Sequence, residues 1–288
     1  MKHFPAFLLL TILAASTQIG CESSSGNSAS VHKLFVVSDD GGMKNTLLSL
    51  IGDAGDIRLT IYELNDPDIV NALVQARQRD AGVHVVFNYW SWNPLDGGTD
   101  QNNRNVPDSG TVATKDVFGS AAPPVPWVNA IPYYYVTHQK TFAFDGRSAM
   151  VMSLNLQPTY FGGTRDFAVY TTDPGEVGEI MTVFNNDYAQ QVLPKSDLDA
   201  GSLVWSSSTE GNSRTKLIGL IGSAKKSVYA YSEEIASVDS YEMGDAGILN
   251  AFIKQAEKGQ DVRLITAMMG NPGDPSSDPN FDTRCYLN

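Results

Sequence analysis

The sequence predicts an α/β protein in which helices cover a mixed, mostly parallel sheet. Residues 33–90 alternate between strand-like and helix-like segments in the order β-α-β-α-β, which is typical of parallel strands joined by helices. A similar order begins again after residue 202, so we expect one complete half and an incomplete second half. A chain of 288 residues is long enough to bury a substantial core.

The first five elements follow from apolar periodicity. Strands are predicted where apolar and polar residues alternate, as they do around Ile57, Leu59 and Ile61. Helices are predicted where apolar residues recur at helical spacing, and one of them begins at the capping residue Asp66. In chain order, these elements are a strand at 33–38, a helix at 43–55, a strand at 56–64, a helix at 66–80 and a strand at 83–90.

A long loop is predicted in the middle of the chain. Residues 91–132 are rich in turn-forming and polar residues, and long loops in compact domains are usually functional or mobile. Aromatic residues in and beside this loop either line a mouth for an apolar or ring-bearing substrate or pack on the sheet: Trp90, Trp92, Trp127 and 133–135. Beyond the loop, we expect strands at 133–138, 140–145, 148–154 and 165–172 and a helix at 173–192.

An internal repeat predicts a duplicated half. Residues 46–64 resemble residues 215–235, and Gly52 corresponds to Gly222, 170 positions later. A match that continues through a strand, a helix and another strand is better explained by duplication than by chance. The expected organisation is therefore a first half at 33–196 and an incomplete second half at 197–288.

The first residues are expected to be an export signal. Residues 7–15 are apolar but too few to cross a bilayer. Small Gly20 precedes Cys21, which resembles a bacterial lipoprotein cleavage site with Cys21 as the lipidated residue; ordinary signal cleavage is the alternative. Residues 1–20 would be the signal peptide, and polar residues 21–32 a flexible tether. We expect an exported protein, lipid-anchored in the bacterial cell envelope on its periplasmic face or outer surface.

The composition is acidic, with a formal net charge of −12. Such a protein is repelled by the phosphates of a nucleic-acid duplex. We therefore expect no nonspecific nucleic-acid binding, although a local basic pocket could still hold one phosphate.

One short stretch, residues 137–156, gathers the residue types of a phosphoryl-transfer site. His138 and Lys140 share a face of a predicted strand, and Ser153 and Asn155 share a face of a following strand. Lysine supplies a compact charge, asparagine supplies amide donors, and histidine can attack phosphorus or shuttle protons near neutral pH. No cluster has the spacing of a zinc or two-metal site, so we expect no metal or other cofactor.

The complete spacing is more specific than its parts. His138-x-Lys140-x4-Asp145-x7-Ser153-x-Asn155 resembles the HxKxxxxD…GSxN signature of the phospholipase D superfamily. The resemblance implies two halves around one central site and a two-step reaction through a phosphohistidine. It implies that His138 is the nucleophile and that Asp145 belongs to the catalytic motif mainly by fixing its geometry. Lys140 and Asn155 would hold the nonbridging oxygens, and Ser153 would support the phosphate pocket.

Two positions depart from the family pattern. Met152 stands where the family usually has glycine. Asp166 stands where an acidic residue, usually glutamate, supports the histidine of the opposite half. Asp166 is therefore expected to act behind the residues that contact the phosphate.

This sequence contains one such motif, because the equivalent of His138 would lie past Asn288. Three explanations compete. The sequence is a fragment or a prematurely ended copy of a two-motif enzyme, two chains pair with one motif each, or the protein binds phosphate esters without turnover. We favour the first, since residues 202–288 would occupy the place of a partner in a homodimer.

The expected function is a phospholipase D-like phosphodiesterase acting on phospholipid or another phosphodiester. Membrane tethering through Cys21 and the acidic charge favour lipid over DNA. An exported nuclease of the same family is the first alternative, and a non-catalytic, phosphate-ester-binding envelope lipoprotein is the second. Glu63, Glu233 and Glu234 stand at equivalent strand ends, where we expect salt bridges rather than contacts with the site.

Overall fold

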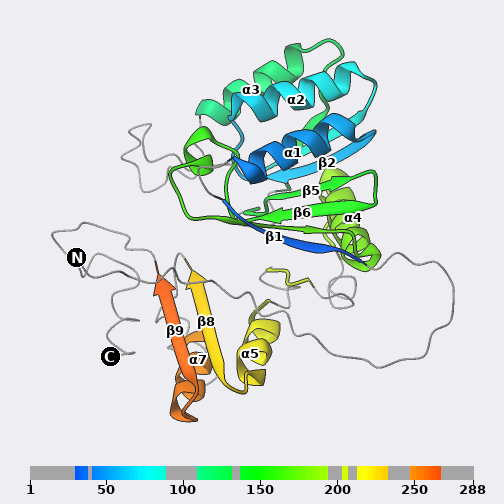
Figure 1. Cartoon of the computed structure of the whole chain (residues 1–288). Coiled ribbons are helices and arrows are strands. Elements are labelled where there is room, and N and C mark those ends of the chain that lie inside the picture. Colours follow the sequence, from blue (N-terminus) through cyan, green and yellow to red (C-terminus); the bar gives the residue numbers. More distant parts are fainter. Residues whose placement is uncertain are drawn as a thin grey trace, which may run out of the picture. The chain divides into compact units, whose positions relative to one another are not determined.

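The chain divides into two compact units, each with its own sheet (Figure 1). The larger unit consists mainly of residues 27–203, and the smaller unit includes residues 211–288. The computed structural model describes residues 30–37, 41–88, 109–131, 137–193, 203–206, 213–232 and 247–266.

A seven-stranded sheet forms the centre of the larger unit, in the order β1-β7-β6-β5-β2-β3-β4. Every strand except β4 overlaps a segment for which apolar periodicity predicts a strand. The strands are β1 His32–Val36, β2 Asp56–Ile61, β3 Gly82–Phe87, β4 Trp127–Asn129, β5 Thr141–Phe144, β6 Ser148–Met152 and β7 Phe167–Thr171.

Most neighbouring strands in this sheet are antiparallel, so the expectation of a mostly parallel sheet is wrong. Only β2–β3 and β3–β4 are parallel among the described pairs, while β1–β7, β7–β6, β6–β5 and β5–β2 are antiparallel. The reason is that no α-helix joins β5 to β6 or β6 to β7. Asp145 and Gly146 instead make a tight turn, with left-handed φ values of 54° and 61°. The predicted α/β class and the helical cover are confirmed.

Helices cover both faces of this sheet (Figure 1). Three of them, α1, α2 and α3, pack on one face, and α4 packs on the other. Asp66 and Asp173 cap α2 and α4, because each carboxylate accepts hydrogen bonds from backbone N–H groups of the first turn. The helices are α1 Gly42–Asp53, α2 Pro67–Gln78, α3 Ser109–Ser120 and α4 Pro174–Tyr188, with a 3-10 helix η2 at Pro158–Phe161.

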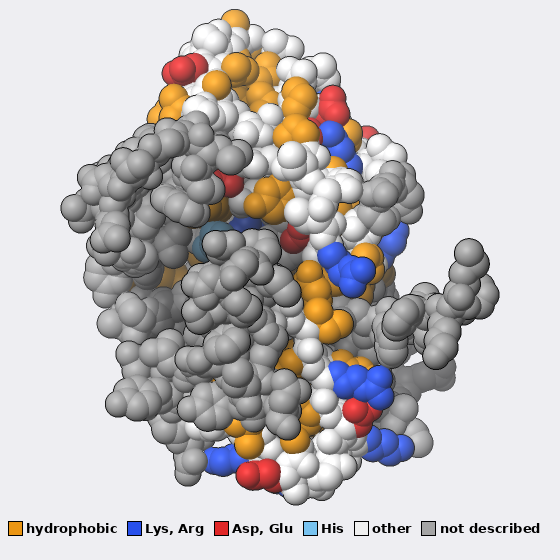
Figure 2. All heavy atoms as spheres, turned by 90° about the vertical axis from the view of Figure 1, so that its left-hand side faces the viewer, with side chains coloured by type: hydrophobic (Ala, Val, Ile, Leu, Met, Phe, Trp, Pro, Cys, Tyr) orange, Lys and Arg blue, Asp and Glu red, His pale blue; other side chains and the backbone are white. Residues whose placement is uncertain are grey.

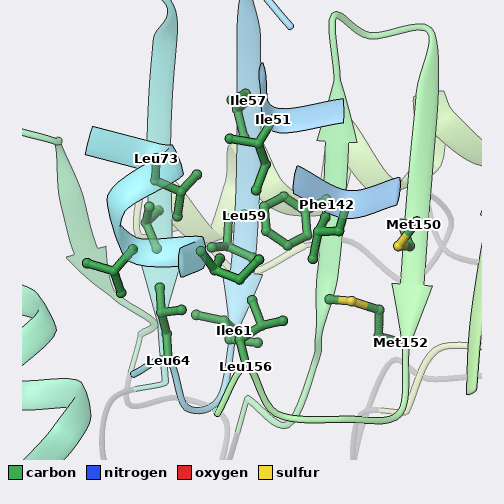
Figure 3. Close-up of a cluster of buried hydrophobic side chains, with 14 of the residues drawn as sticks. Ile51, Ile57, Leu59, Ile61, Leu64, Leu73, Phe142, Met150, Met152 and Leu156 are labelled. Atoms are coloured by element: carbon green, nitrogen blue, oxygen red, sulfur yellow. The ribbon is translucent and has the colours of Figure 1, made fainter. Parts of the chain in front are cut away.

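The main core lies between the sheet and helices α1 and α2 (Figure 3). Ile57, Leu59 and Ile61 of β2 are fully buried there. They pack with Ile51 of α1 and Leu73 of α2. Burial of each such side chain contributes about 1.5–3 kcal/mol. A one-residue slip of β2 would turn this apolar set to the opposite face of the sheet, away from α1 and α2, so the core fixes where the carboxyl end of β2 lies.

Helix α3 and strand β4 lie within residues 91–132, where the sequence predicts a loop, so that prediction is wrong for these two elements. The residues of α3, SGTVATKDVFGS, have no clear apolar stripe. Tertiary contacts stabilise the helix instead. The hydroxyl of Thr111 accepts a hydrogen bond from the N–H of Leu64, and the hydroxyl of Thr114 donates to the Leu64 carbonyl. Phe118 is fully buried in the core.

The smaller unit has the element order of residues 42–87 in the larger one. Its two strands, β8 and β9, pair in parallel, as β2 and β3 do. Ile221, Val228, Leu249 and Phe252 form a small core beneath them. The elements are α5 Ser213–Ser223, β8 Ser227–Ser232, α7 Ile248–Glu257 and β9 Asp261–Thr266.

Several sequence predictions concern residues outside the described part of the chain. Trp127 is described, and its ring packs against Phe87 with the centroids 6.0 Å apart, as the packing alternative expects. No helix in the described ranges combines the length and the apolar character that a membrane span needs. The predictions outside those ranges are the signal peptide at 1–20, Cys21 and most of the tether, Trp90, Trp92, 133–135, Glu233 and Glu234.

Candidate active site

Polar side chains gather where β2 ends and β5 begins. Strand β5 starts at Thr141, so His138 and Lys140 stand just before it and not on the predicted strand. Lys140 still continues the pairing of β5 with β6, because its carbonyl accepts a hydrogen bond from the N–H of Met152 at 2.9 Å. Thr60 of β2 pairs with Thr141, so the residues that follow β2 lie next to those that precede β5.

Tyr62, which follows β2, contacts both His138 and Lys140. The rings of Tyr62 and His138 meet edge to face, with their centroids 4.5 Å apart. The Nζ atom of Lys140 lies 5.4 Å from the centroid of the same tyrosine ring. It also donates a hydrogen bond to the His138 carbonyl at 3.1 Å. The imidazole and the ammonium are therefore held beside each other.

Asn88 fixes the backbone immediately before His138. This residue follows β3 and is buried, and its Oδ1 accepts a hydrogen bond from the N–H of Thr137 at 2.8 Å. The N–H of Asn88 donates to the carbonyl of Ile61 at 3.0 Å. Asn88 thus joins the ends of β2 and β3 to the segment that carries the histidine.

The imidazole of His138 is neutral at physiological pH. His138 is exposed, but one side of its ring is packed against the protein. The resulting loss of hydration lowers the pKa of His138, and the charge of Lys140 lowers it further, to about 4. A neutral imidazole has a nitrogen lone pair available, as nucleophilic attack requires.

Lys140 supplies positive charge at this edge of the sheet. The residue is only 5% exposed, although lysine is rarely buried. Its ammonium faces the ring of Tyr62, a geometry that stabilises a cation. An ammonium with little surrounding water attracts an anion more strongly than an exposed one does.

The carboxamide of Asn155 is held by Glu63. Both residues are buried, and the Nδ2 of Asn155 donates to the Oε2 of Glu63 at 2.7 Å. The Nε2 of Gln157 donates to the same oxygen at 2.9 Å. We expected Glu63 to be a salt-bridged strand end and not a contact of the site, and the structure places it against Asn155, a candidate phosphate-binding residue. Glu63 is a polar residue at the next alternate position after Ile57, Leu59 and Ile61, and this was the signal for it in the sequence.

Ser153 and Asp166 form a pair between β6 and β7. The Ser153 hydroxyl donates to the Oδ1 of Asp166 at 2.6 Å and accepts from the N–H of Phe167 at 2.9 Å. The hydroxyl of Thr164 also donates to Asp166. Asp166 thus orients the segment that contains Ser153, and its support of an opposite histidine stays a prediction.

Asp145 is not brought to this cluster. It begins the turn at the far end of β5, where its Oδ1 accepts hydrogen bonds from the N–H groups of Gly55 at 2.9 Å and Asp56 at 2.8 Å. Its own N–H donates to the Asp56 carbonyl at 2.8 Å. Asp145 therefore ties the β5–β6 turn to the start of β2. We remove it from the candidate catalytic residues and keep only its structural role.

The other described histidines make different contacts. His32 lies on the edge strand β1, and its Nε2 is 2.9 Å from the Oε2 of Glu176 on α4. The ring of His84 meets Tyr188 of α4 edge to face, and burial together with the charge of Arg58 lowers the pKa of His84. These contacts give both histidines structural roles.

Met152, at the position where the family usually has glycine, packs into the main core and is 6% exposed. Its side chain therefore fills the interior of the protein. On the face shown in Figure 2, the Lys and Arg side chains of the described residues stand in separate small groups among acidic and uncharged ones.

Comparisons with known proteins agree with this geometry. A family model described as cardiolipin synthase, PLD-like domain, matches residues 47–188, which include the whole stretch from His138 to Asn155. A search of the curated proteins found no match.

Among solved structures, a phosphatidylserine synthase from Haemophilus influenzae is 12% identical, with a TM-score of 0.55 over 81% of this chain and 61% of that protein. A polyphosphate kinase from Porphyromonas gingivalis is 16% identical, with a TM-score of 0.55 over 86% of this chain and 40% of that protein. Nuc, a phospholipase D family member from Salmonella typhimurium, is 20% identical, with a TM-score of 0.45 over 56% of this chain and 95% of Nuc. At these identities, the similarity to the first two concerns the fold.

The matched family model and the His138–Asn155 motif within it lead to one assignment. Proteins that this family model describes are in general phosphoryl-transfer enzymes of the phosphodiesterase type. The chain belongs to the phospholipase D superfamily.

Proposed function

We propose that this chain carries the nucleophilic half of a phosphodiesterase site that acts on phospholipids, with His138 as the nucleophile. The observation that carries the proposal is the imidazole of His138 held beside the buried ammonium of Lys140 by the ring of Tyr62, in surroundings that lower the pKa of His138. A neutral nucleophile next to a fixed cation suits attack on an anionic phosphodiester.

In the first step, a ring nitrogen of His138 bonds to phosphorus, and the bond from phosphorus to the leaving alcohol oxygen breaks. The alcohol leaves with a proton from a general acid. In this family, the general acid belongs to a second motif. In the second step, a water oxygen bonds to phosphorus, that water returns a proton to the group that acted as general acid, and the bond from phosphorus to nitrogen breaks. The products are an alcohol, a phosphomonoester and the regenerated imidazole.

Lys140 and Asn155 would stabilise the negative charge on the nonbridging oxygens. Both are 5% exposed, so they act where little water competes for the anion. In this proposal Ser153 contributes indirectly, because its hydroxyl is already bonded to Asp166 and Phe167.

Phospholipid is the proposed substrate class because of the expected N-terminus. Export through residues 1–20 and lipidation of Cys21 would keep the site close to a bilayer, at a high local concentration of lipid headgroups. The acidic net charge of −12 opposes binding to long nucleic acids.

The test is to trap the phosphoryl group on His138. The purified chain is incubated with bis(p-nitrophenyl) phosphate, phosphatidylcholine vesicles or single-stranded DNA. Intact-protein mass and acid lability then report phosphohistidine. His138→Ala is the test variant, and His32→Gln is the matched control, since His32 lies on an edge strand beside Glu176.

We expect an acid-labile phosphoryl group that forms in the wild type and in His32→Gln but not in His138→Ala. Labelling by vesicles would support the lipid substrate, and labelling by DNA alone would favour a nuclease. Binding of phosphate esters with no labelling would contradict the enzymatic proposal and favour a binding role.

A further inference from the structure

Glu63 is buried at the edge of the sheet where the candidate site lies. It follows β2 and is 7% exposed. Its Oε2 accepts two amide hydrogen bonds, from Asn155 at 2.7 Å and from Gln157 at 2.9 Å. A buried carboxylate is costly unless it is well hydrogen-bonded, so this pair of donors is a built arrangement.

The backbone on both sides of the Glu63–Asn155 contact is held tightly. The carbonyl of Glu63 accepts a hydrogen bond from the N–H of Leu156 at 3.0 Å. The carbonyl of Leu156 accepts from the N–H groups of Asn65 at 2.9 Å and Asp66 at 2.8 Å. The threonine hydroxyls of α3 hold the N–H and the carbonyl of Leu64. The carboxylate and the carboxamide therefore have little freedom to separate.

This contact determines which way the Asn155 carboxamide faces. If the amide were reversed, its Oδ1 would face the Oε2 of Glu63, and two acceptors would stand against each other. In the observed orientation, Oδ1 is buried and has no hydrogen-bond partner among the described residues. Leaving such an acceptor unpaired costs about 1–3 kcal/mol. The free energy gained from the hydrogen bond to Glu63 therefore exceeds the cost of leaving Oδ1 unpaired.

We propose that Glu63 is a positioning residue, which fixes the Asn155 carboxamide so that an N–H group is available to a phosphate oxygen. This inference rests on the proposed function and extends it. One amide hydrogen of Asn155 is committed to Glu63, and the other has only a long contact of 3.4 Å with the hydroxyl of Tyr160. A phosphate oxygen is a stronger acceptor than a phenol, so the second hydrogen is the one that the substrate takes.

Glu63 and its neighbour Tyr62 then form one positioning element at the end of β2. Tyr62 contacts the nucleophile and Lys140, while Glu63 holds the carboxamide. The core residues of β2 set the place of both, and α3 holds the residue after them. Tyr62 and Glu63, at the end of β2, thus position three side chains. Two of these, His138 and Lys140, precede β5, and the third, Asn155, follows β6.

The test is a double-mutant cycle between Glu63 and Asn155. Glu63→Leu removes the acceptor at similar volume, and Glu63→Gln retains an acceptor oxygen. Asn155→Ala and the double variant Glu63→Leu, Asn155→Ala complete the cycle. Glu179→Leu is the matched control, because Glu179 is another buried carboxylate, on α4. The measured quantities are the rate of His138 phosphorylation by bis(p-nitrophenyl) phosphate and the dissociation constant of tungstate, with thermal unfolding as the measure of folding.

Glu63→Leu should lower the labelling rate roughly 10- to 100-fold, as loss of a positioning contact commonly does. Glu63→Gln should restore most of that rate. The double variant should be no slower than Asn155→Ala alone, because Glu63 acts through Asn155. Glu179→Leu should change stability but leave the rate per folded molecule unchanged. If Glu63→Leu does not fold, Glu63→Ala replaces it in the cycle, with the same expected coupling to Asn155→Ala.

Two outcomes would overturn the inference. In one, the effects of Glu63→Leu and Asn155→Ala multiply, which would make Glu63 purely structural. In the other, Glu63→Leu has no effect on folded protein. If labelling depends on His138 but the cycle shows no coupling, only this inference fails. If the wild type is not labelled at all, the proposed function fails, and the tungstate cycle alone decides the role of Glu63.

Discussion

The two ends of strands β2 and β5 use polar side chains in opposite ways. At the turn end, Asp145 accepts two backbone hydrogen bonds from Gly55 and Asp56 and fixes a hairpin turn. At the site end, Lys140 is buried and the Oδ1 of Asn155 has no partner among the described residues. Both ends carry residues of the same sequence motif, so the motif combines fold-fixing and substrate-facing positions.

This contrast shows how the site end differs physically from a structural turn. At the turn end, one carboxylate satisfies backbone groups near water. At the site end, charged and amide groups are buried. A second buried atom there, the Nδ2 of Asn88, has no hydrogen-bond partner within the described ranges. Buried polar groups without partners are costly, and a bound ligand is one way of completing them.

The largest expected effect is the loss of charge at Lys140. Lys140→Met keeps the side-chain volume but removes the cation, so the rate of His138 labelling should fall about 100- to 1,000-fold. Lys115→Met is the matched control. Lys115 is partly buried over the rings of Phe87 and Trp127, and burial lowers its pKa. Equal losses in the two variants, measured on folded protein, would contradict the assignment of Lys140.

The pH dependence of labelling should come next in size. With a pKa of about 4, His138 stays about 90% neutral at pH 5, so labelling should be nearly flat from pH 7 to 5 and fall below that. An imidazole with the ordinary pKa of about 6.5 would already lose activity below pH 6.5. Folding favours the neutral form, so stability should also decrease as the pH falls from about 6.5 towards 4. Titration of the His138 ring by NMR measures this pKa directly.

At the turn end, Asp145→Ala should reduce stability and not chemistry. The variant loses the acceptor for two N–H groups, and alanine disfavours the left-handed φ of 54°. We expect the free energy of unfolding to decrease by about 1–3 kcal/mol. Asp145→Asn retains an acceptor and tolerates this φ, so it should lose less. Urea unfolding measures both, and a loss of labelling rate in folded Asp145→Ala would return Asp145 to the catalytic residues.

The smallest effect is expected for Ser153→Ala. The exposed hydroxyl links Asp166 to the N–H of Phe167, so its loss should lower the free energy of unfolding by about 0.5–1.5 kcal/mol. The labelling rate should change less than in Lys140→Met. A rate loss as large as that of Lys140→Met would show that Ser153 binds the phosphate directly.

Apolar periodicity predicted most strands and helices of the larger unit but not their directions. The antiparallel course from β5 onwards depends on a turn at Asp145-Gly146, and an Asp-Gly pair is itself a hairpin signal that could have shown it. Helix α3 could not be predicted in this way. Its stability comes from contacts of Thr111, Thr114 and Phe118 with distant residues, which local sequence does not contain.

The site residues that belong to one sequence motif could be predicted. The site residue that strand register brings to them could not. His138, Lys140 and Asn155 belong to one motif, so a single stretch of sequence named them. Glu63 lies 92 residues from Asn155 in the chain, and their contact depends on how the end of β2 meets the segment after β6. A sequence contains no direct record of that alignment.

The most direct test of the central claim is a crystal structure of the full chain with tungstate, an analogue of the phosphoryl group. The account predicts anomalous tungsten density within reach of the imidazole of His138, the Nζ of Lys140 and the Nδ2 of Asn155, with the Asn155–Glu63 hydrogen bond retained. Tungstate bound elsewhere on the chain, or these three side chains directed away from any shared anion, would contradict it.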